Sequence, residues 1–205
     1  MKHIAIVGAG GHTHSSLNLI RQYFSEANIY LYDDAYALMD SKKIDNIKLV
    51  GTINSISQDL NVFLSIGDNC IRQAFFEKFL KQLITHNLIH KTAYCESNLV
   101  IGIANQIFAK VYINAFVKIG NNNIINTGAI VEHEVKIGNH NHISVGVKIC
   151  GQVTIGNNCM IGAGATIIDE LSICDNVTIG AGAVVINNIT QSGTYVGVPA
   201  KLVFN

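Results

Sequence analysis

The sequence predicts a short α/β domain with a parallel sheet, followed by a parallel β-helix of six-residue repeats. Every sixth residue from Ile101 to Val185 is Ile or Val, and further features of this half recur every 18 residues. The first half instead alternates apolar strands with helical segments. With 205 residues, of which 49% are hydrophobic and 14% charged, the chain has enough apolar material for both cores and too little charge for disorder.

The six-residue period fits neither an α-helix, which repeats every 3.6 residues, nor a flat strand, which repeats every two. It is explained if each hexad forms one short strand and one turn, and if three such faces close a coil of 18 residues. Aliphatic residues such as Val117 and Val135, two before the hexad positions, then share the inward face. Stacked coils bury these columns as a continuous core. The 18-residue spacing recurs in Asn105, Asn123 and Asn141 and in Ile-Gly pairs at 101–102, 119–120, 137–138 and 155–156.

The first half predicts strands that alternate with helices, which indicates a parallel sheet. Strands are expected at 4–7, 29–32, around 49–50 and at 62–66, with one helix at about 15–24 and another that follows Gly67-Asp68-Asn69 and runs to about 86.

A glycine-rich turn, Gly8-Ala9-Gly10-Gly11-His12, joins the first strand to the first helix. Glycine lets backbone N–H groups approach a phosphate at a helix N-terminus, although tight turns without a ligand also use it. Asp33, 23 residues after Gly10, ends the second strand, where an acid binds a ribose hydroxyl. The domain is too short for both halves of a dinucleotide fold. A mononucleotide or nucleotide-sugar therefore fits better than NAD.

His133 is the candidate catalytic residue of the second half. It follows inward Val131, is flanked by Glu134, and has Ala115 one coil before it and Gly151 one coil after it. Small neighbours leave open space beside the ring, and a flanking carboxylate raises the basicity of the far nitrogen. This pattern predicts a general base beside a groove. The alternative is a solvated polar turn.

His142 precedes inward Ile143 and is expected to point outward. Ile124 and Met160 share its column at 18-residue spacing, so exposed apolar residues are expected to flank it. Such a stripe suggests a subunit contact, and a three-faced helix suits a cyclic trimer. The alternative is a surface histidine with scattered apolar neighbours.

No metal site is expected, because His133, His140 and His142 lie in different turns or on different faces. The odd number of cysteines favours reduced thiols and a cytoplasmic protein, with Cys150, Cys159 and Cys174 as packing residues. Lys plus Arg and Asp plus Glu balance at 14 each, which argues against nucleic acid or a membrane surface as partner. No apolar stretch reaches the length of a membrane span, and the N-terminal run lacks a signal-peptide cleavage site.

Several motifs beyond the hexads occur together in this chain. They are Gly8-Ala9-Gly10-Gly11-His12, Asp33-Asp34, Ser65-Ile66-Gly67-Asp68-Asn69-Cys70-Ile71-Arg72, Leu88-Ile89-His90, Val131-Glu132-His133-Glu134, His142-Ile143-Ser144-Val145-Gly146 and Gly197-Val198-Pro199-Ala200-Lys201. The combination resembles the NeuD/PglD-type hexapeptide-repeat sugar acyltransferases over essentially the whole chain. It is most similar to the UDP-4-amino-sugar N-acetyltransferases, and sialic acid O-acetyltransferases share the architecture.

The resemblance implies a left-handed β-helix and a Rossmann-like first domain that binds the nucleotide-sugar. The expected boundaries are a first domain at 1–88, a linker at 89–98, the helix at 99–190 and a tail at 191–205.

The resemblance also implies roles for individual residues. His133 would be the general base, Glu134 would orient it, the Gly151 N–H would hold the oxyanion, and His142 would contact acetyl-CoA. The coenzyme groove would further include Ile155, Gly162, Ala163, Gly164 and Pro199. The nucleotide-sugar would be held by Gly10, Gly11, His12, Asp33, Asp34, Gly67 and Arg72. Family members often carry Lys or Arg where this chain has His14, and a neutral His is a weaker phosphate partner than Lys.

The expected activity is acetyl-CoA-dependent N-acetylation of a UDP-linked 4-amino sugar, by direct transfer, in the synthesis of bacterial surface glycans or glycoproteins. A homotrimer with active sites between subunits is the expected assembly. Three alternatives remain: an O-acetyltransferase of sialic acid-like sugars, a metal-dependent hydratase of the β-helix type, and a non-catalytic nucleotide-sugar-binding scaffold.

Overall fold

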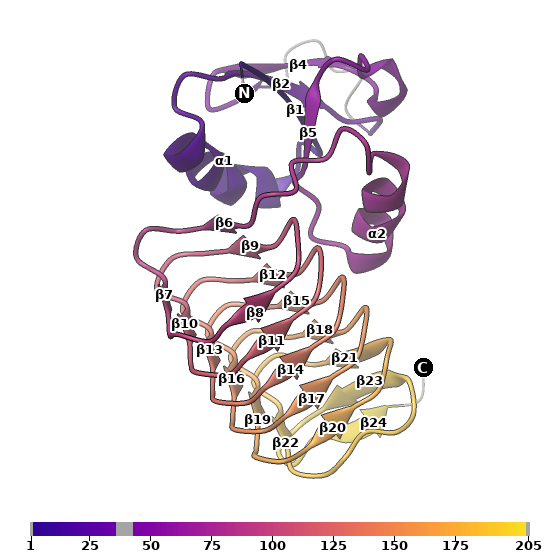
Figure 1. Cartoon of the computed structure of the whole chain (residues 1–205). Coiled ribbons are helices and arrows are strands. Elements are labelled where there is room, and N and C mark those ends of the chain that lie inside the picture. Colours follow the sequence, from indigo (N-terminus) through magenta and orange to yellow (C-terminus); the bar gives the residue numbers. More distant parts are fainter. Residues whose placement is uncertain (1, 36–42, 204–205) are drawn as a thin grey trace. The chain divides into compact units, whose positions relative to one another are not determined.

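The chain folds into two compact units, residues 1–85 and 86–205 (Figure 1). The structure is a computed structural model and describes residues 2–35 and 43–203. The first unit is the expected short α/β domain and the second the expected β-helix. Within the described ranges, no helix is long and apolar enough to cross a membrane.

The first unit is built on one mostly parallel sheet with the strand order β3-β4-β2-β1-β5. Its strands are β1 (His3–Val7), β2 (Asn28–Tyr32), β3 (Lys43–Ile44), β4 (Ile47–Gly51) and β5 (Asn61–Leu64). Only β3 runs antiparallel to its neighbour. Ile4, Ile6 and Leu31 are fully buried, as the apolar runs predict. The helical elements are α1 (Gly11–Tyr23), α2 (Asn69–Lys78) and the 3₁₀ turn η1 (Ile53–Ser55).

Both predicted helices differ from the structure at one end. Helix α1 starts four residues earlier than position 15, directly after its N-cap Gly10, so the glycine-rich turn leads straight into it. Helix α2 ends at Lys78, and its predicted continuation to about 86 is wrong. Val62 of β5 donates to the Gln82 carbonyl and accepts from the Ile84 N–H, so this segment pairs with the sheet instead. Burial of Leu83 and Ile84 beside the sheet outweighs their compatibility with a helix.

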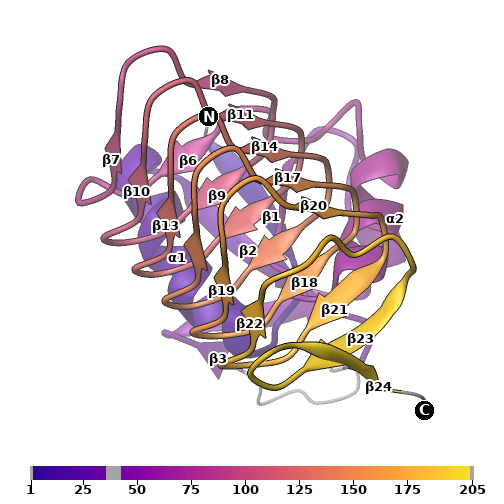
Figure 2. The same cartoon turned by 90° about the horizontal axis from the view of Figure 1, so that it is seen from below.

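The second unit is a parallel β-helix whose three sheets surround one core (Figure 2). The first sheet contains β6 (Leu88–Ile89), β9 (Gln106–Ile107), β12 (Ile124–Ile125), β15 (His142–Ile143), β18 (Met160–Ile161), β21 (Val177–Ile179), β23 (Gly193–Val196) and β24 (Lys201–Val203). The second contains β7 (Tyr94–Cys95), β10 (Tyr112–Ile113), β13 (Ile130–Val131), β16 (Lys148–Ile149), β19 (Thr166–Ile167) and β22 (Val184–Val185). The third contains β8 (Val100–Ile101), β11 (Lys118–Ile119), β14 (Lys136–Ile137), β17 (Thr154–Ile155) and β20 (Ser172–Ile173).

The 18-residue coil is confirmed by the strand register. Tyr112 pairs with Ile130, Ile130 with Lys148, and Lys148 with Thr166, each 18 residues further on. The hexad residues from Ile107 to Val185 are at most 4% exposed and form the core of the unit. Each coil therefore rests on its neighbours through side-chain columns and parallel hydrogen bonds.

The three recurring asparagines form a buried ladder at one corner. The Asn123 Nδ2 donates to Asn105 Oδ1 at 3.0 Å and to the Gly138 carbonyl at 2.9 Å. Asn123 Oδ1 in turn accepts from the Asn141 backbone N–H at 2.8 Å. The ladder thus satisfies buried amide groups that would otherwise oppose folding.

A second ladder of Asx side chains lies on a neighbouring turn. Asn139 Oδ1 accepts from the backbone N–H of Asn121 at 2.7 Å, and Asn157 Oδ1 accepts from that of Asn139 at 2.8 Å. Asp175 ends this ladder by accepting from the Asn157 N–H at 2.7 Å. In this helix, an Asx side chain on one coil commonly caps a turn N–H on the coil before it.

Two of the predicted boundaries do not match the structure. Residues 89–98 are not a linker, because this segment contains β7 and its His90 N–H donates to the Ile107 carbonyl of the next coil at 2.8 Å. The tail expected at 191–205 contains β23 and β24, which extend the first sheet. The sequence signal was weak at both ends, because Cys95 stands at a hexad position in place of the usual Ile or Val and the hexads stop after Val185.

Candidate active site

His133 lies in the turn after β13, and its side chain is 52% exposed. Its Nδ1 is 3.2 Å from Oε2 of Glu134. The same carboxylate oxygen accepts from Nε2 of Gln152 at 3.0 Å. Gln152 stands one coil above Glu134, so the coil stacking itself positions the side chain that holds the carboxylate.

The pKa of Glu134 is lowered, first by the hydrogen bond from Gln152 and then by the one from His133. The carboxylate is therefore ionised at neutral pH and accepts a hydrogen bond from the Nδ1–H. This interaction favours the tautomer in which Nε2 carries the lone pair. Nε2 has no hydrogen-bond partner among the residues that the structure describes.

Gly151 packs directly against the His133 ring, as the coil spacing predicts. A Cβ at position 151 would stand 2.7 Å from both Cε1 and Nε2 of His133, closer than side-chain atoms tolerate. Gly151 thus leaves free the space that the His133 ring occupies.

The Gly151 N–H, however, already has an acceptor. It donates to Oδ1 of Asp169 at 3.0 Å, one coil further on. Its expected role as an oxyanion donor therefore requires this hydrogen bond to be exchanged for one to the reacting carbonyl. His133, Gly151, Gln152, Asp169 and Glu170 together line one small pocket.

Gln152 and Asp169 were not among the predicted site residues. Both stand 18 residues after a predicted one, Gln152 after Glu134 and Asp169 after Gly151. The 18-residue spacing that predicts the contact of His133 with Gly151 therefore also points to Gln152 and Asp169.

His142 does not lie in an exposed apolar stripe. Its side chain is 8% exposed, with Nε2 3.3 Å from Nδ2 of Asn126, and its neighbour Ile124 is fully buried. The predicted exposure of Ile124 was therefore wrong. Met160 is half-buried.

The remaining predicted coenzyme residues differ in accessibility. Ile155 is a hexad residue of the core, so its side chain does not line a groove, which corrects that prediction. Gly162 packs so closely on the next coil that a Cβ would lie 2.5 Å from the Ala181 N. Ala163, Gly164 and Pro199 are exposed and remain open to a ligand.

A second pocket gathers five of the predicted nucleotide-sugar residues in the first unit, with a volume of about 330 Å³. Its lining consists of Gly8, Gly10, Gly11, His12, Asp33, Ser65, Ile66 and Gly67. A Cβ at Gly10 or Gly11 would meet nothing within 4 Å, so the backbone there is open to a ligand. Gly8 instead has a φ of +107°, and a Cβ would lie 2.7 Å from the Ser65 carbonyl oxygen.

The two aspartates after β2 accept hydrogen bonds from backbone N–H groups of the neighbouring loops. Asp33 accepts from the Ala9 N–H at 2.7 Å and from the Ala35 N–H at 2.8 Å, which ties the glycine-rich turn to the end of β2. Asp34 accepts from the Ile53 N–H at 2.8 Å and is not part of the pocket lining. His14 is exposed on α1 and also lies outside the lining.

Arg72 is fully buried and does not line the pocket. Its Nη1 donates to the Ile66 and Gly67 carbonyls, each at 3.1 Å, and its Nη2 to Oδ1 of Asn69 at 2.8 Å. Burial lowers the pKa of Arg72 to about 10, so it is still a cation at neutral pH. The predicted contact of Arg72 with the nucleotide-sugar is therefore wrong. Its side chain instead holds the loop that carries Gly67.

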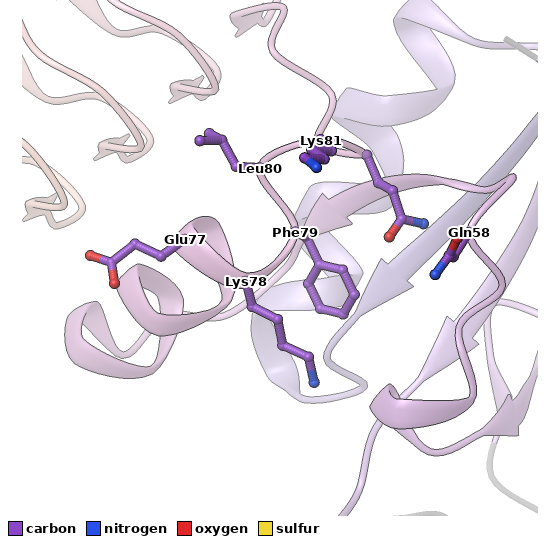
Figure 3. A pocket seen from close by; sticks show the side chains of 7 residues that line it. Gln58, Glu77, Lys78, Phe79, Leu80 and Lys81 are labelled. Atoms are coloured by element: carbon purple, nitrogen blue, oxygen red, sulfur yellow. The ribbon is translucent and has the colours of Figure 1, made fainter.

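A larger pocket, of about 670 Å³, lies at the end of α2 and contains none of the predicted site residues. Figure 3 shows the Lys78 side chain alongside the Phe79 ring, with Nζ 5.2 Å from the ring centroid. The same Nζ donates to Oδ1 of Asn54 at 2.8 Å. The Lys78 ammonium is thus engaged by Phe79 and Asn54 of the chain itself. The pocket is large, but it contains none of the predicted site residues, so we do not assign the function to it.

The three histidines considered for a metal do not meet. Nδ1 of His140 contacts Nδ2 of Asn122 at 2.8 Å, away from the Glu134 partner of His133. Across residues 2–35 and 43–203, no group of three or more His, Cys, Asp or Glu side chains is placed to hold a metal ion. All five cysteines have free thiols, and Cys159 is buried in the core of the helix.

Known proteins match both units. Residues 3–79 match the PglD N-terminal domain family, and residues 134–169 match the bacterial transferase hexapeptide family. Among curated proteins, none matches the chain.

Solved structures match the chain over nearly its full length. The acetyltransferase domain of PglB from Neisseria gonorrhoeae, in complex with acetyl coenzyme A, is 28% identical with a TM-score of 0.88 over 98% of this chain and 99% of that one. PerB from Caulobacter crescentus, in complex with CoA and GDP-perosamine, is 29% identical with a TM-score of 0.88 over 100% and 98%. WeeI from Acinetobacter baumannii, 21% identical, shares the fold with a TM-score of 0.83 over 99% and 100%.

Proposed function

Because the chain belongs to the NeuD/PglD-type hexapeptide-repeat sugar acyltransferases, we propose that it transfers an acetyl group from acetyl-CoA to the amine of a nucleotide-linked sugar. The observation that carries the proposal is the arrangement at His133. Its Nδ1 is bound by Glu134, its Nε2 has no partner among the described residues, and Gly151 leaves room beside it. A general base needs this combination, whereas a binding scaffold does not.

The proposed reaction is direct transfer. The sugar amine attacks the thioester carbonyl carbon, the C–N bond forms and the C–S bond to CoA breaks. Nε2 of His133 takes a proton from the attacking nitrogen and returns it to the departing CoA sulfur. Glu134 stabilises the imidazolium that exists between these events, since its lowered pKa keeps it ionised.

The Gly151 N–H is the proposed donor to the thioester oxygen. A neutral carbonyl competes poorly with the Asp169 carboxylate for this donor, whereas the negatively charged oxygen of the tetrahedral intermediate competes well. The hydrogen bond would then be gained mainly in the transition state, which is the condition for raising kcat.

The nucleotide is proposed to bind at the glycine-rich turn of the first unit. Gly10 and Gly11 expose backbone at the start of α1, where the helix dipole favours a phosphate. Asp33 faces the same pocket and can take a ribose hydroxyl with the lone pairs that its loop contacts leave unused. UDP is the nucleotide that the family resemblance implies, whereas the similar protein PerB is in complex with GDP-perosamine.

The proposal is tested by mixing the purified protein with acetyl-CoA and a panel of UDP-, dTDP- and GDP-linked amino sugars, with free sialic acid as a further acceptor. Release of the CoA thiol reports turnover. We expect turnover with one class of amino-sugar nucleotide and much slower turnover with the same nucleotide carrying a hydroxyl. Turnover with sialic acid alone would replace the proposal with O-acetylation, and a panel without any turnover would contradict it.

A cyclic trimer with active sites between subunits is proposed as the assembly, because His133 is half exposed and its pocket is shallow in one chain. Sedimentation of the purified protein tests this. A species of three times 22.2 kDa is expected, and an active monomer would overturn it.

A further inference from the structure

We propose that Asp169 binds the protonated amino group of the acceptor and thereby selects amines over hydroxyls. The inference rests on the proposed function and concerns its site. Asp169 is held in place by the Gly151 N–H, which donates to Oδ1 at 3.0 Å. Its other oxygen, Oδ2, has no hydrogen-bond partner within the described part of the chain.

Two unsatisfied acceptors therefore line the same pocket as His133. Nε2 of His133 lies against Gly151, and Asp169 is bonded to the N–H of that same glycine. An ammonium group has three N–H donors. It can give one to Nε2 and another to Oδ2, whereas a hydroxyl has a single donor and no charge to offer the carboxylate.

The charge of the pocket agrees with a cationic acceptor group. Its lining contains the carboxylates of Asp169 and Glu170, and no Lys or Arg belongs to that lining among the described residues. Glu134, whose lowered pKa keeps it ionised at neutral pH, adds a third acidic side chain beside His133. Such a site attracts an ammonium and repels an acceptor that carries its own carboxylate, such as sialic acid.

A purely structural role for Asp169 would not need the charge. Capping of a turn N–H by the side chain 18 residues later is performed elsewhere in this helix by Asn121, Asn139 and Asn157. Asn at 169 would preserve the hydrogen bond to Gly151 and remove only the negative charge. Asp169→Asn is therefore a suitable test variant, and it is expected to fold because Asn makes the same cap elsewhere in the β-helix.

In the proposed sequence, the bound ammonium first loses one proton to solvent by way of His133. The free amine then attacks the thioester, and its second proton passes through His133 to the CoA sulfur. One N-acetyl sugar, one CoA thiol and one proton leave for each acetyl-CoA and ammonium consumed. Asp169 contributes by concentrating and orienting the ammonium and is not itself acylated.

The test compares the D169N variant with the wild type on an amino-sugar nucleotide and on the same nucleotide with a hydroxyl in place of the amine. We expect D169N to raise KM for the amine about tenfold, and to lower the amine-to-hydroxyl ratio of kcat/KM by about the same factor. The dissociation constant for acetyl-CoA, measured by calorimetry, should stay within about twofold.

The matched control is D175N, because Asp175 makes the same kind of cap, to Asn157, on another turn. It should leave all these constants unchanged. D169N with wild-type KM and wild-type acceptor ratio would overturn the proposal. A D169A variant with higher kcat/KM for the amine would also overturn it, since Asp169 would then only obstruct the Gly151 N–H. If the wild type itself fails to acetylate any amine, the proposed function fails first, so the two failures are distinguishable.

Discussion

The imidazole of His133 lies against the backbone of Gly151, 18 residues later, so closely that a Cβ there would stand 2.7 Å from Cε1 and Nε2. Because Gly151 has no side chain, the reactive ring of His133, one coil earlier, occupies the space where a side chain would lie. Any residue other than glycine at 151 has to displace the ring.

Gly151→Ala is therefore expected to lower kcat about 100-fold, because the added methyl must push the ring out of its reactive position. Steady-state kinetics measures this, with thermal unfolding as a check on the fold. In a His133→Ala background the same change should cost little more, because the ring it displaces is gone. A full additional 100-fold loss there would show that Gly151 acts independently of the ring.

His133→Ala is expected to lower kcat by about 10²–10⁴-fold with the melting temperature nearly unchanged, because the side chain is half exposed and makes one hydrogen bond. Glu134→Gln, which keeps the shape but removes the charge, should cost about tenfold. Single-turnover kinetics with saturating acetyl-CoA separates chemistry from binding. Wild-type turnover in His133→Ala would exclude this residue as the base.

Gly8 and Gly10 provide a matched pair in the first unit. Gly10→Ala adds a methyl in open space, so it should preserve folding and raise KM for the nucleotide-sugar about tenfold by crowding the ligand. Gly8→Ala, at a φ of +107° and 2.7 Å from the Ser65 carbonyl oxygen, should destabilise the fold itself. Urea unfolding and nucleotide titration distinguish the two effects, and an unaltered KM in Gly10→Ala would place the nucleotide elsewhere.

Arg72→Ala is expected to destabilise the first unit by about 3 kcal/mol, because it leaves the Ile66 and Gly67 carbonyls and the Asn69 amide oxygen without their donor. Urea unfolding measures the loss. Full stability combined with lost nucleotide binding would instead mean that the guanidinium contacts the ligand directly.

Stability should fall between about pH 9 and 11, in part because burial raises the pKa of the Cys159 thiol from 9.0 to about 11. The unfolded chain releases this proton at lower pH than the folded chain does, so the thiol's contribution is complete below pH 9 and is lost as the pH rises through 11. Urea unfolding at several pH values should show a shallower decline for Cys159→Ala than for the wild type. Equal slopes would show that the thiol ionises alike in both states.

The fold could be predicted in most of its parts because its repeat is encoded in one residue type at one spacing. Ile and Val at every sixth position fix the inward face, and the register between coils follows from it. The helix ends could not be located this way, since β7 and β23 pair through backbone groups without the hexad residue. The end of α2 was missed for a related reason, because the sheet edge beside Val62 recruits residues 82–84.

The site was predictable where spacing alone brings residues together, as with His133 and Gly151. Spacing alone does not predict which way a side chain points, or which acceptors compete for the same N–H donor. Arg72 reads as a phosphate ligand by residue type, yet it is fully buried and satisfied by carbonyls. Likewise, nothing in the motif at 131–134 indicates that the Gly151 N–H is held by Asp169.

The 18-residue register also limits how the second unit can change in length. Removing or inserting a number of residues other than 18 between β13 and β16 would rotate the later coils relative to the earlier ones, which would separate His133 from Gly151 and Asp169. A gain or loss of one whole coil before β13 would leave these residues aligned. Variants of this enzyme that gain or lose one whole coil before β13 should therefore keep the catalytic turn intact, whereas single-residue indels between β13 and β16 should not.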